Sequence, residues 1–301
     1  MWHFAALPFA LWLSSGSFEK VGLTVNRASY QRLEKDKNAS SLYTSEKNLW
    51  DLSDHALLKI GHRIWQNTCK KRRDQITFWH EKRQFPSIGI AHFNWLPASY
   101  QGPNMENTFA DFLTFAAKKR VDIPTWLKKN PYCPWSKRAL FYEEFYSPKM
   151  QELRLFLLDT IPIQVEYIRD HLQNAWQKLL NKTKGKEKDL LIHRLSTLAS
   201  QKNGIYSLFD YSSVYRQAIQ LPYKKSKGLF KDPSKDQENT GVFQVLQEID
   251  EKIFCKRPEK AFFLAATNLI KKQAEKAPKN TSEVFFLPVW LKRLETYRDS
   301  Q

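Results

Sequence analysis

The alternation of apolar and polar positions along the chain predicts a molecule built mostly of helices. Between residues 49 and 69, apolar side chains recur on one helical face, and Ser53 or Asp54 is a suitable N-cap in front of it. The same spacing returns in segment after segment from residue 105 onward. We expect helices at 105–120, 124–130, 136–146, 148–158, 161–182, 187–201, 204–219, 239–254, 258–277 and 286–298.

One stretch departs from this pattern and favours β-structure. Residues 75–96 contain two runs rich in β-branched and aromatic side chains, 76–79 and 88–93, separated by a Phe-Pro pair. We expect a small hairpin, with His92 following the strand alternation and facing inward. The predicted fold class is therefore α+β, predominantly α, with the hairpin inserted after the first long helix.

Composition divides the chain into three parts. Residues 1–17 read MWHFAALPFALWLSSGS, an apolar stretch followed by small residues, as in a secretory signal. A signal predicts a periplasmic or secreted protein; an N-terminal segment that packs on the domain instead would suit a cytoplasmic one. Residues 18–48 form a polar lead-in, and 49–301 form one helical domain. No apolar run reaches the roughly 18 residues that a membrane span needs.

The charge balance indicates anionic partners. Lysine and arginine total 48 against 31 aspartates and glutamates, which gives a formal net charge of +17. Nucleic acid, acidic lipid and cell-wall polymers with carboxylates or phosphates all fit this charge. Basic clusters at 70–73, 118–120, 182–188 and 224–231, with aromatics between them, keep a nucleic-acid-binding helical protein as an alternative. No recognition motif accompanies them, and 222–238 is expected to be a basic loop.

The most informative block spans residues 64–97. It reads IWQNTCKKRRDQITFWHEKRQFPSIGIAHFNWLP. A helix end, a short hairpin and an S-I-G-I-A-H segment in this order resemble the core of the phage-type lysozymes. The block is still more similar to a family of bacterial lysozyme-like proteins with the pattern I-W-x-N-E, then W-N-x-G-E-x-F-x-S-L-G-I-G-H-F-I-W-Y-P. The matching positions are Ile64, Trp65, Asn67, Trp79, Phe85, Ser87, Gly89, Ile90, His92, Phe93, Trp95 and Pro97.

This resemblance implies a lysozyme-like core with a small β-hairpin and an extended C-terminal helical part. Weaker similarity reaches further along the chain, at Asp210, at Gln244 and around Trp290. Glycoside cleavage commonly uses two carboxyl groups astride the scissile bond. Glu81 lies six residues before Ser87, the family spacing of the second carboxylate and its hydroxyl residue. The resemblance thus makes Glu81 and Ser87 the candidate catalytic residues.

The first carboxyl group is missing. Thr68 stands where the family pattern has the glutamate that protonates the leaving oxygen, and no acidic residue occurs between Asp54 and Asp74. A hydroxyl group does not protonate a leaving oxygen at neutral pH, and general-acid catalysis is worth roughly 10²–10⁴-fold. We therefore expect weak turnover at most, and expect Thr68→Glu to gain hydrolysis if the rest of the site is intact.

Several side chains of the same block are candidate ligand contacts. Trp79, Phe93 and Trp95 are suited to stack on sugar faces, but core packing is the favoured role for each. Arg83 is suited to pair with carboxylates or phosphates. His92 and Gln244 complete the candidate set, and a structural role is favoured for His92.

Other chemistry has little support in the sequence. The chain lacks the glycine-rich phosphate-binding motifs and any His and Cys spacing typical of zinc sites, so we expect no cofactor and no metal. Cys69 stands beside a basic run that could activate its thiol, which leaves a cysteine nucleophile with His92 as a minor alternative. Asp210 is expected to be a helix-surface or capping residue.

The sequence therefore supports three hypotheses. The first is a degenerate lysozyme-like protein, a pseudoenzyme that binds cell-wall glycan or a related anionic polymer with little or no cleavage. The second is an active muramidase or lytic transglycosylase whose general acid has moved elsewhere. The third is the basic nucleic-acid-binding protein described above.

Overall fold

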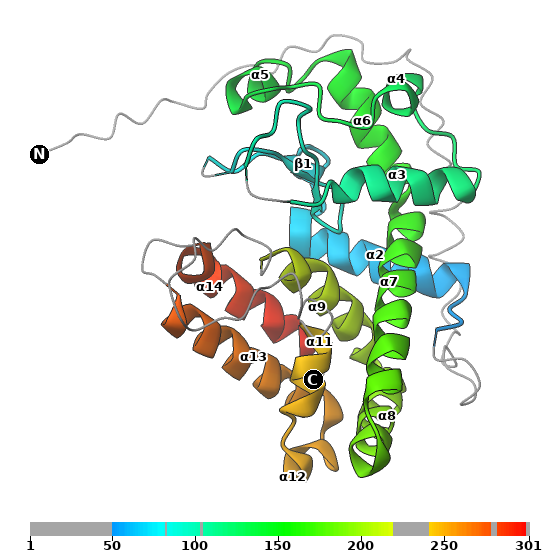
Figure 1. Ribbon diagram of the computed structural model, residues 1–301, viewed down its shortest axis with the longest axis vertical. Coiled ribbons are helices and arrows are strands. Elements are labelled where there is room, and N and C mark those ends of the chain that lie inside the picture. The colour runs from blue at the N-terminus through cyan, green and yellow to red at the C-terminus, as the bar shows by residue number, and fades with distance from the viewer. Residues whose placement is uncertain (1–49, 82, 103–104, 219–240, 278–281, 299–301) are drawn as a thin grey trace, which may run out of the picture. The chain divides into compact units, whose positions relative to one another are not determined.

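The computed structural model describes residues 50–81, 83–102, 105–218, 241–277 and 282–298. All of them belong to one compact unit of the chain, Tyr43–Gln301. This unit is mostly helical with one small antiparallel sheet (Figure 1), which confirms the α+β, predominantly α prediction. The predicted signal at 1–17, the lead-in at 18–48 and the basic loop at 222–238 lie outside the described residues. No helix of the described residues is both long and apolar enough to cross a membrane.

The helices begin and end close to the predicted positions. Ser53 caps the first described helix by accepting a hydrogen bond from the Ala56 amide at 3.2 Å, and Pro148 and Pro258 open two later helices. Local capping and periodicity therefore account for most boundaries. The described helices are α2 Asp54–Cys69, α3 Thr108–Lys118, α4 Thr125–Lys129, α5 Arg138–Glu143, α6 Pro148–Asp159, α7 Ile161–Lys182, α8 Gly185–Ala199, α9 Gly204–Ala218, α11 Val242–Gln247, α12 Glu251–Phe254, α13 Pro258–Lys276 and α14 Ser282–Leu294, with short 3₁₀ turns η1 Asp74–Ile76 and η3 Glu295–Tyr297.

The single helix expected at 239–254 is wrong, because the chain breaks there into α11 and α12. The buried guanidinium of Arg194 donates hydrogen bonds to the carbonyl oxygens of Leu246 and Ile249. Asp250 then caps the second piece by accepting from the Ile253 amide at 3.1 Å. A distant arginine thus satisfies carbonyls that a continuous helix would have bonded internally.

The β-region forms three short antiparallel strands in the order β1-β2-β3. They are β1 Thr77–Phe78, β2 Ser87–Ile88 and β3 Phe93–Asn94. The continuous strand expected over 88–93 is wrong, because a tight turn at 89–92 joins β2 to β3. Gly89 adopts φ +73 there, and a side chain at this position would meet the amide oxygen of Gln164, which accepts from the Ile90 amide. His92 ends the turn with φ +51 instead of continuing a strand.

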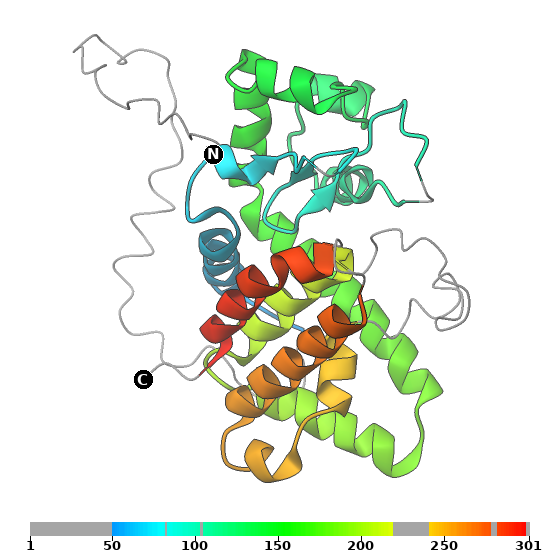
Figure 2. The same cartoon turned by 90° about the vertical axis from the view of Figure 1, so that its left-hand side faces the viewer.

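Two groups of helices meet around α2. Helix α2 crosses α7 (Figure 1), and Gly61 lets the two approach so closely that a Cβ there would lie 2.4 Å from a methyl carbon of Ile161. Helices α13 and α14 lie side by side in both views (Figure 2), and η3 packs against α9 and α13. This packing brings α14 and η3, near the end of the chain, next to the residues at the end of α2.

Candidate functional site

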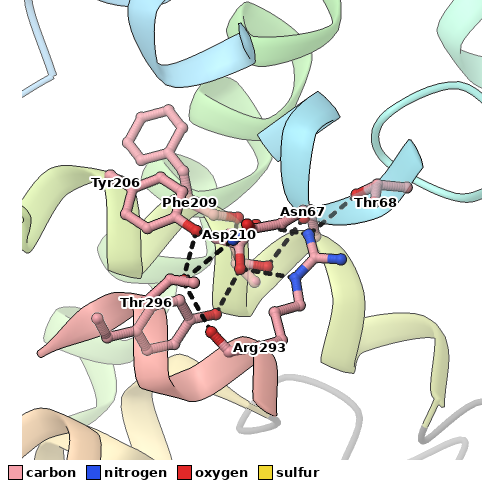
Figure 3. A network of polar contacts seen from close by, with 10 residues as sticks. Asn67, Thr68, Tyr206, Phe209, Asp210, Arg293 and Thr296 are labelled. Atoms are coloured by element: carbon pink, nitrogen blue, oxygen red, sulfur yellow. Dashed lines mark hydrogen bonds and ion pairs between the residues drawn. The ribbon is translucent and has the colours of Figure 1, made fainter. Parts of the chain in front are cut away.

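Thr68, in the last turn of α2, contacts an arginine from the other end of the chain. Its hydroxyl oxygen accepts a hydrogen bond from Nη2 of Arg293, on α14, at 3.0 Å. Figure 3 shows the guanidinium group of Arg293 lying between Thr68 and Asp210. The position where the lysozyme-like pattern has a carboxylic acid is therefore bordered by a permanent cation.

Asp210, on α9, binds this cation as a buried partner. Its side chain is 0% exposed, and that of Arg293 is 8% exposed. The carboxylate accepts from Nε and Nη2 of Arg293 at 2.8 and 2.5 Å, and from the hydroxyl of Tyr297 at 2.7 Å. The prediction of a surface or capping role for Asp210 is wrong, because its helix turns this residue into the core and the carboxylate neutralises the guanidinium.

The ion pair keeps Arg293 charged. Burial alone would lower the pKa of its guanidinium, but the charge and hydrogen bonds of Asp210 raise it above its ordinary value. Nη1 is the one guanidinium nitrogen without a hydrogen bond to the described residues (Figure 3), and the side chain as a whole is 8% exposed. Arg293 therefore has N–H groups left to donate to a ligand.

A second layer of polar contacts fixes the end of α2 to η3. Asn67 donates to the hydroxyls of Tyr206 and Thr296, the latter at 3.0 Å, and these two hydroxyls lie 2.8 Å apart. Arg63 donates to the Thr296 carbonyl at 2.7 Å and lies 3.8 Å above the ring of Tyr206. These contacts hold Thr68 and Arg293 in a rigid frame.

The sheet carries a second group of polar residues. Nη1 of Arg83 donates to the hydroxyl of Ser87, on β2, at 2.8 Å. Burial first, then the charges of Arg293 and Arg83, lower the pKa of His92 to about 3, so its imidazole is neutral at physiological pH. Of the predicted residues, Ser87 thus contacts Arg83, Thr68 contacts Arg293, and the charges of both arginines act on His92. We call Thr68, Ser87, His92, Arg83 and Arg293 the cationic site.

The three predicted sugar-stacking aromatics lie in the core instead. Trp79 is 1% exposed and donates its indole N–H to the Arg83 carbonyl at 2.8 Å. Phe93 is 1% exposed and stacks on Phe112 with ring centroids 4.7 Å apart. Trp95 is 0% exposed among other aromatic rings. Core packing accounts for all three, and no ring face is open to a ligand.

The other two predicted residues stand apart from the described contacts of the cationic site. Glu81 is exposed on the turn between β1 and β2, and Gln244 is half-buried on α11. No hydrogen bond within the described part of the chain joins either side chain to Thr68 or Arg293. Glu81 lies in the hairpin that follows the end of α2.

The structure gives no support to a cysteine nucleophile at Cys69. Cys69 is 1% exposed, and burial raises the pKa of its thiol to about 12, so the nucleophilic thiolate is absent at neutral pH. Among the residues that the structure describes, no group of three or more His, Cys, Asp and Glu side chains is positioned to hold a metal ion.

Comparison with protein-family models, with curated proteins and with solved structures gives no significant match for this chain. The lysozyme-like core therefore remains a prediction from residues 64–97, and the functional argument rests on the site itself.

Proposed function

We propose that this protein binds an anionic glycan of the bacterial cell wall on a lysozyme-like scaffold and cleaves it little or not at all. The observation that carries the proposal is the guanidinium of Arg293 beside Thr68, where cleavage would require a protonated carboxyl group. A guanidinium stays protonated at any physiological pH, so it donates hydrogen bonds but does not transfer a proton.

The geometry suits recognition of a carboxylate. Nη1 of Arg293 and the guanidinium of Arg83 are charged donors, and hydrogen bonds from such groups to carboxylates are stronger than neutral ones. His92 adds a neutral ring without repelling the arginines. Peptidoglycan carries carboxylates on its peptide stems, so its repeating anionic chain fits this donor set.

An active enzyme with a relocated acid has less support. Asp210 is the carboxylate closest to Thr68 through the described hydrogen bonds, since both contact Arg293. Both of its oxygens already accept bonds from Arg293 or Tyr297, and the side chain is fully buried. With both oxygens occupied and no exposed surface, this carboxyl group is not placed to deliver a proton to a ligand.

A nucleic-acid role also has less support. The described basic clusters lie on separate elements: 70–73 follows α2, 118–120 ends α3, and 182–188 joins α7 to α8. The cluster at 224–231 lies outside the described residues. Extended polyanions are bound by cations aligned along a groove, whereas these three clusters lie on three separate segments of the chain.

The proposal places the protein where it meets the cell wall, in the periplasm or outside the cell, in agreement with the signal-like residues 1–17. It is tested by cosedimentation of the full chain with purified peptidoglycan. We expect Arg83→Gln to weaken binding at least about tenfold, because a charge-assisted hydrogen bond contributes about 1.5–3 kcal/mol.

The matched control is Lys256→Gln, which removes the same charge from an exposed position after α12 and should leave binding unchanged. Equal loss in both variants would mean that only the overall charge attracts the polymer, and would overturn the proposal. Turbidity clearance of cell walls that disappears in Glu81→Gln would instead establish the enzyme.

A further inference from the structure

Helix α14 presents an apolar face that its own packing does not cover. Phe285, Phe286, Val289 and Trp290 occupy positions i, i+1, i+4 and i+5, which share one side of a helix. Phe285 is 58% exposed and Val289 is 61% exposed. Phe286 and Trp290 are half-buried, and their rings are nearly parallel, with an interplanar angle of 28° and centroids 6.1 Å apart. We call these four residues the aromatic face.

The aromatic face runs into the cationic site. Arg293 follows Phe286 by seven residues, so it lies on the same side of α14 two turns further along. From the sheet side, His80 packs its ring edge against Phe286 with centroids 5.1 Å apart, and Phe78 packs on His80. Phe78 is itself 42% exposed and extends the apolar surface onto β1. Arg83 donates its backbone N–H to the His80 carbonyl at 3.0 Å, so the rings around His80 lie next to the turn that carries Arg83.

We propose that the aromatic face is a saccharide-stacking subsite, on which a sugar ring of the glycan lies while a carboxylate of the same chain binds Arg293 and Arg83. This inference rests on the proposed function and deepens it. A pyranose ring presents a C–H face that packs on an aromatic ring, and an exposed apolar patch of this kind marks a binding surface. The occupant is therefore a carboxylate-bearing polysaccharide.

The charge next to the aromatic face favours such a glycan over single-stranded nucleic acid, which also stacks on aromatic rings. Asp210 neutralises Arg293, so Arg83 alone contributes net charge among the groups described at this site. A phosphate backbone carries one charge per nucleotide and is bound by several cations along its path. A polymer with widely spaced carboxylates needs only the donors present here.

The test measures binding of the full chain to purified peptidoglycan and to poly-L-glutamate, an anionic polymer without sugar rings. Phe285→Leu and Phe286→Leu keep an apolar side chain but remove the ring. We expect each to weaken peptidoglycan binding about 3- to 10-fold, and to leave poly-L-glutamate binding unchanged. Phe286→Tyr, which restores a ring, should bind as the natural chain does. Tyr146→Leu, at a 79% exposed aromatic outside this face, is the matched control and should bind normally.

The outcomes separate the two proposals. If Arg83→Gln weakens peptidoglycan binding but both leucine variants bind normally, the subsite is refuted and the anionic-glycan role stands. If Arg83→Gln has no effect on either polymer, the role itself fails. If the leucine variants lose both polymers equally, the loss is not due to ring stacking and the subsite is again refuted. Tighter binding of oligothymidylate than of peptidoglycan, weakened by Phe286→Leu, would assign the face to nucleic acid.

Discussion

Replacing Asp210 by Asn is the most direct perturbation of the cationic site. The substitution keeps the size of the side chain, and its amide oxygen still accepts from Tyr297. The negative charge is lost, and the new N–H₂ group competes as a donor with the guanidinium of Arg293, whose side chain is 8% exposed. The variant therefore leaves a buried cation without a counter-charge.

The size of the effect follows from this burial. Removing one partner of a buried ion pair costs about 3–5 kcal/mol of folding free energy, because the remaining charge is uncompensated. Asp210→Asn and Arg293→Met should each approach this loss. The double variant removes both charges and leaves only apolar and neutral polar groups, so it should lose less than the sum, with a coupling free energy of about 2–3 kcal/mol.

The assay is urea unfolding of all four proteins, followed by tryptophan fluorescence and by circular dichroism at constant pH and salt. The free energies of unfolding are compared only among proteins with equal m-values, because equal m-values indicate that a similar amount of surface is exposed on unfolding. As a control, Arg72→Gln removes an arginine whose pair with Asp74 is solvent-exposed, and should cost less than about 1 kcal/mol. Single variants that lose under 1 kcal/mol, with strictly additive effects in the double, would refute the buried pair.

Two further predictions concern the residues around this pair. Thr68→Glu should show no cell-wall hydrolysis, contrary to the expectation from sequence alone, because Arg293 would lower the pKa of the new carboxyl group. In the Asp210→Asn background, Thr68→Glu should recover part of the lost stability. Clearance of cell walls by the single Thr68→Glu variant would contradict this reasoning. His92 has a pKa of about 3 in the folded protein against 6.5 in the unfolded chain, so only the unfolded state takes up this proton between those values and stability falls as pH drops from 6.5 towards 3. His92 contributes less than about 1.4 kcal/mol per pH unit to the slope of the unfolding free energy against pH, because its ring is only half-buried. His92→Asn, which tolerates φ +51, should flatten the urea stability profile over that range; an unchanged slope would show that His92 titrates normally.

Periodicity and capping predict the helices of this chain well because both are local. The 22 residues of α7 have an amphipathic pattern and a proline in the first turn, and the predicted limits 161–182 match the structure. The break between α11 and α12 was not predictable in this way, since it depends on Arg194 from a separate helix. The turn at 89–92 was missed for the same reason, because Gln164 of α7 accepts from its Ile90 amide.

The candidate site was only partly predictable. Thr68, Ser87, His92 and Arg83 are close in sequence, and their grouping followed from the block at 64–97. Arg293 makes the decisive contact from 225 positions away, and no pattern around it signals burial. The aromatic residues illustrate a related limit. The sequence around Trp79 does not show whether its ring contacts a ligand or packs in the core, and the structure places it in the core, the favoured role.

The pair of Arg293 and Asp210 also bears on biosynthesis. A chain that leaves the ribosome in order exposes Asp210 long before its two partners, Arg293 and Tyr297, have been made. Until α14 docks, α9 carries a carboxylate without a counter-charge on the face that becomes buried in the folded protein. Docking of α9 therefore waits until α14 and η3 have been translated, and truncated products that lack these elements leave Asp210 without a counter-charge.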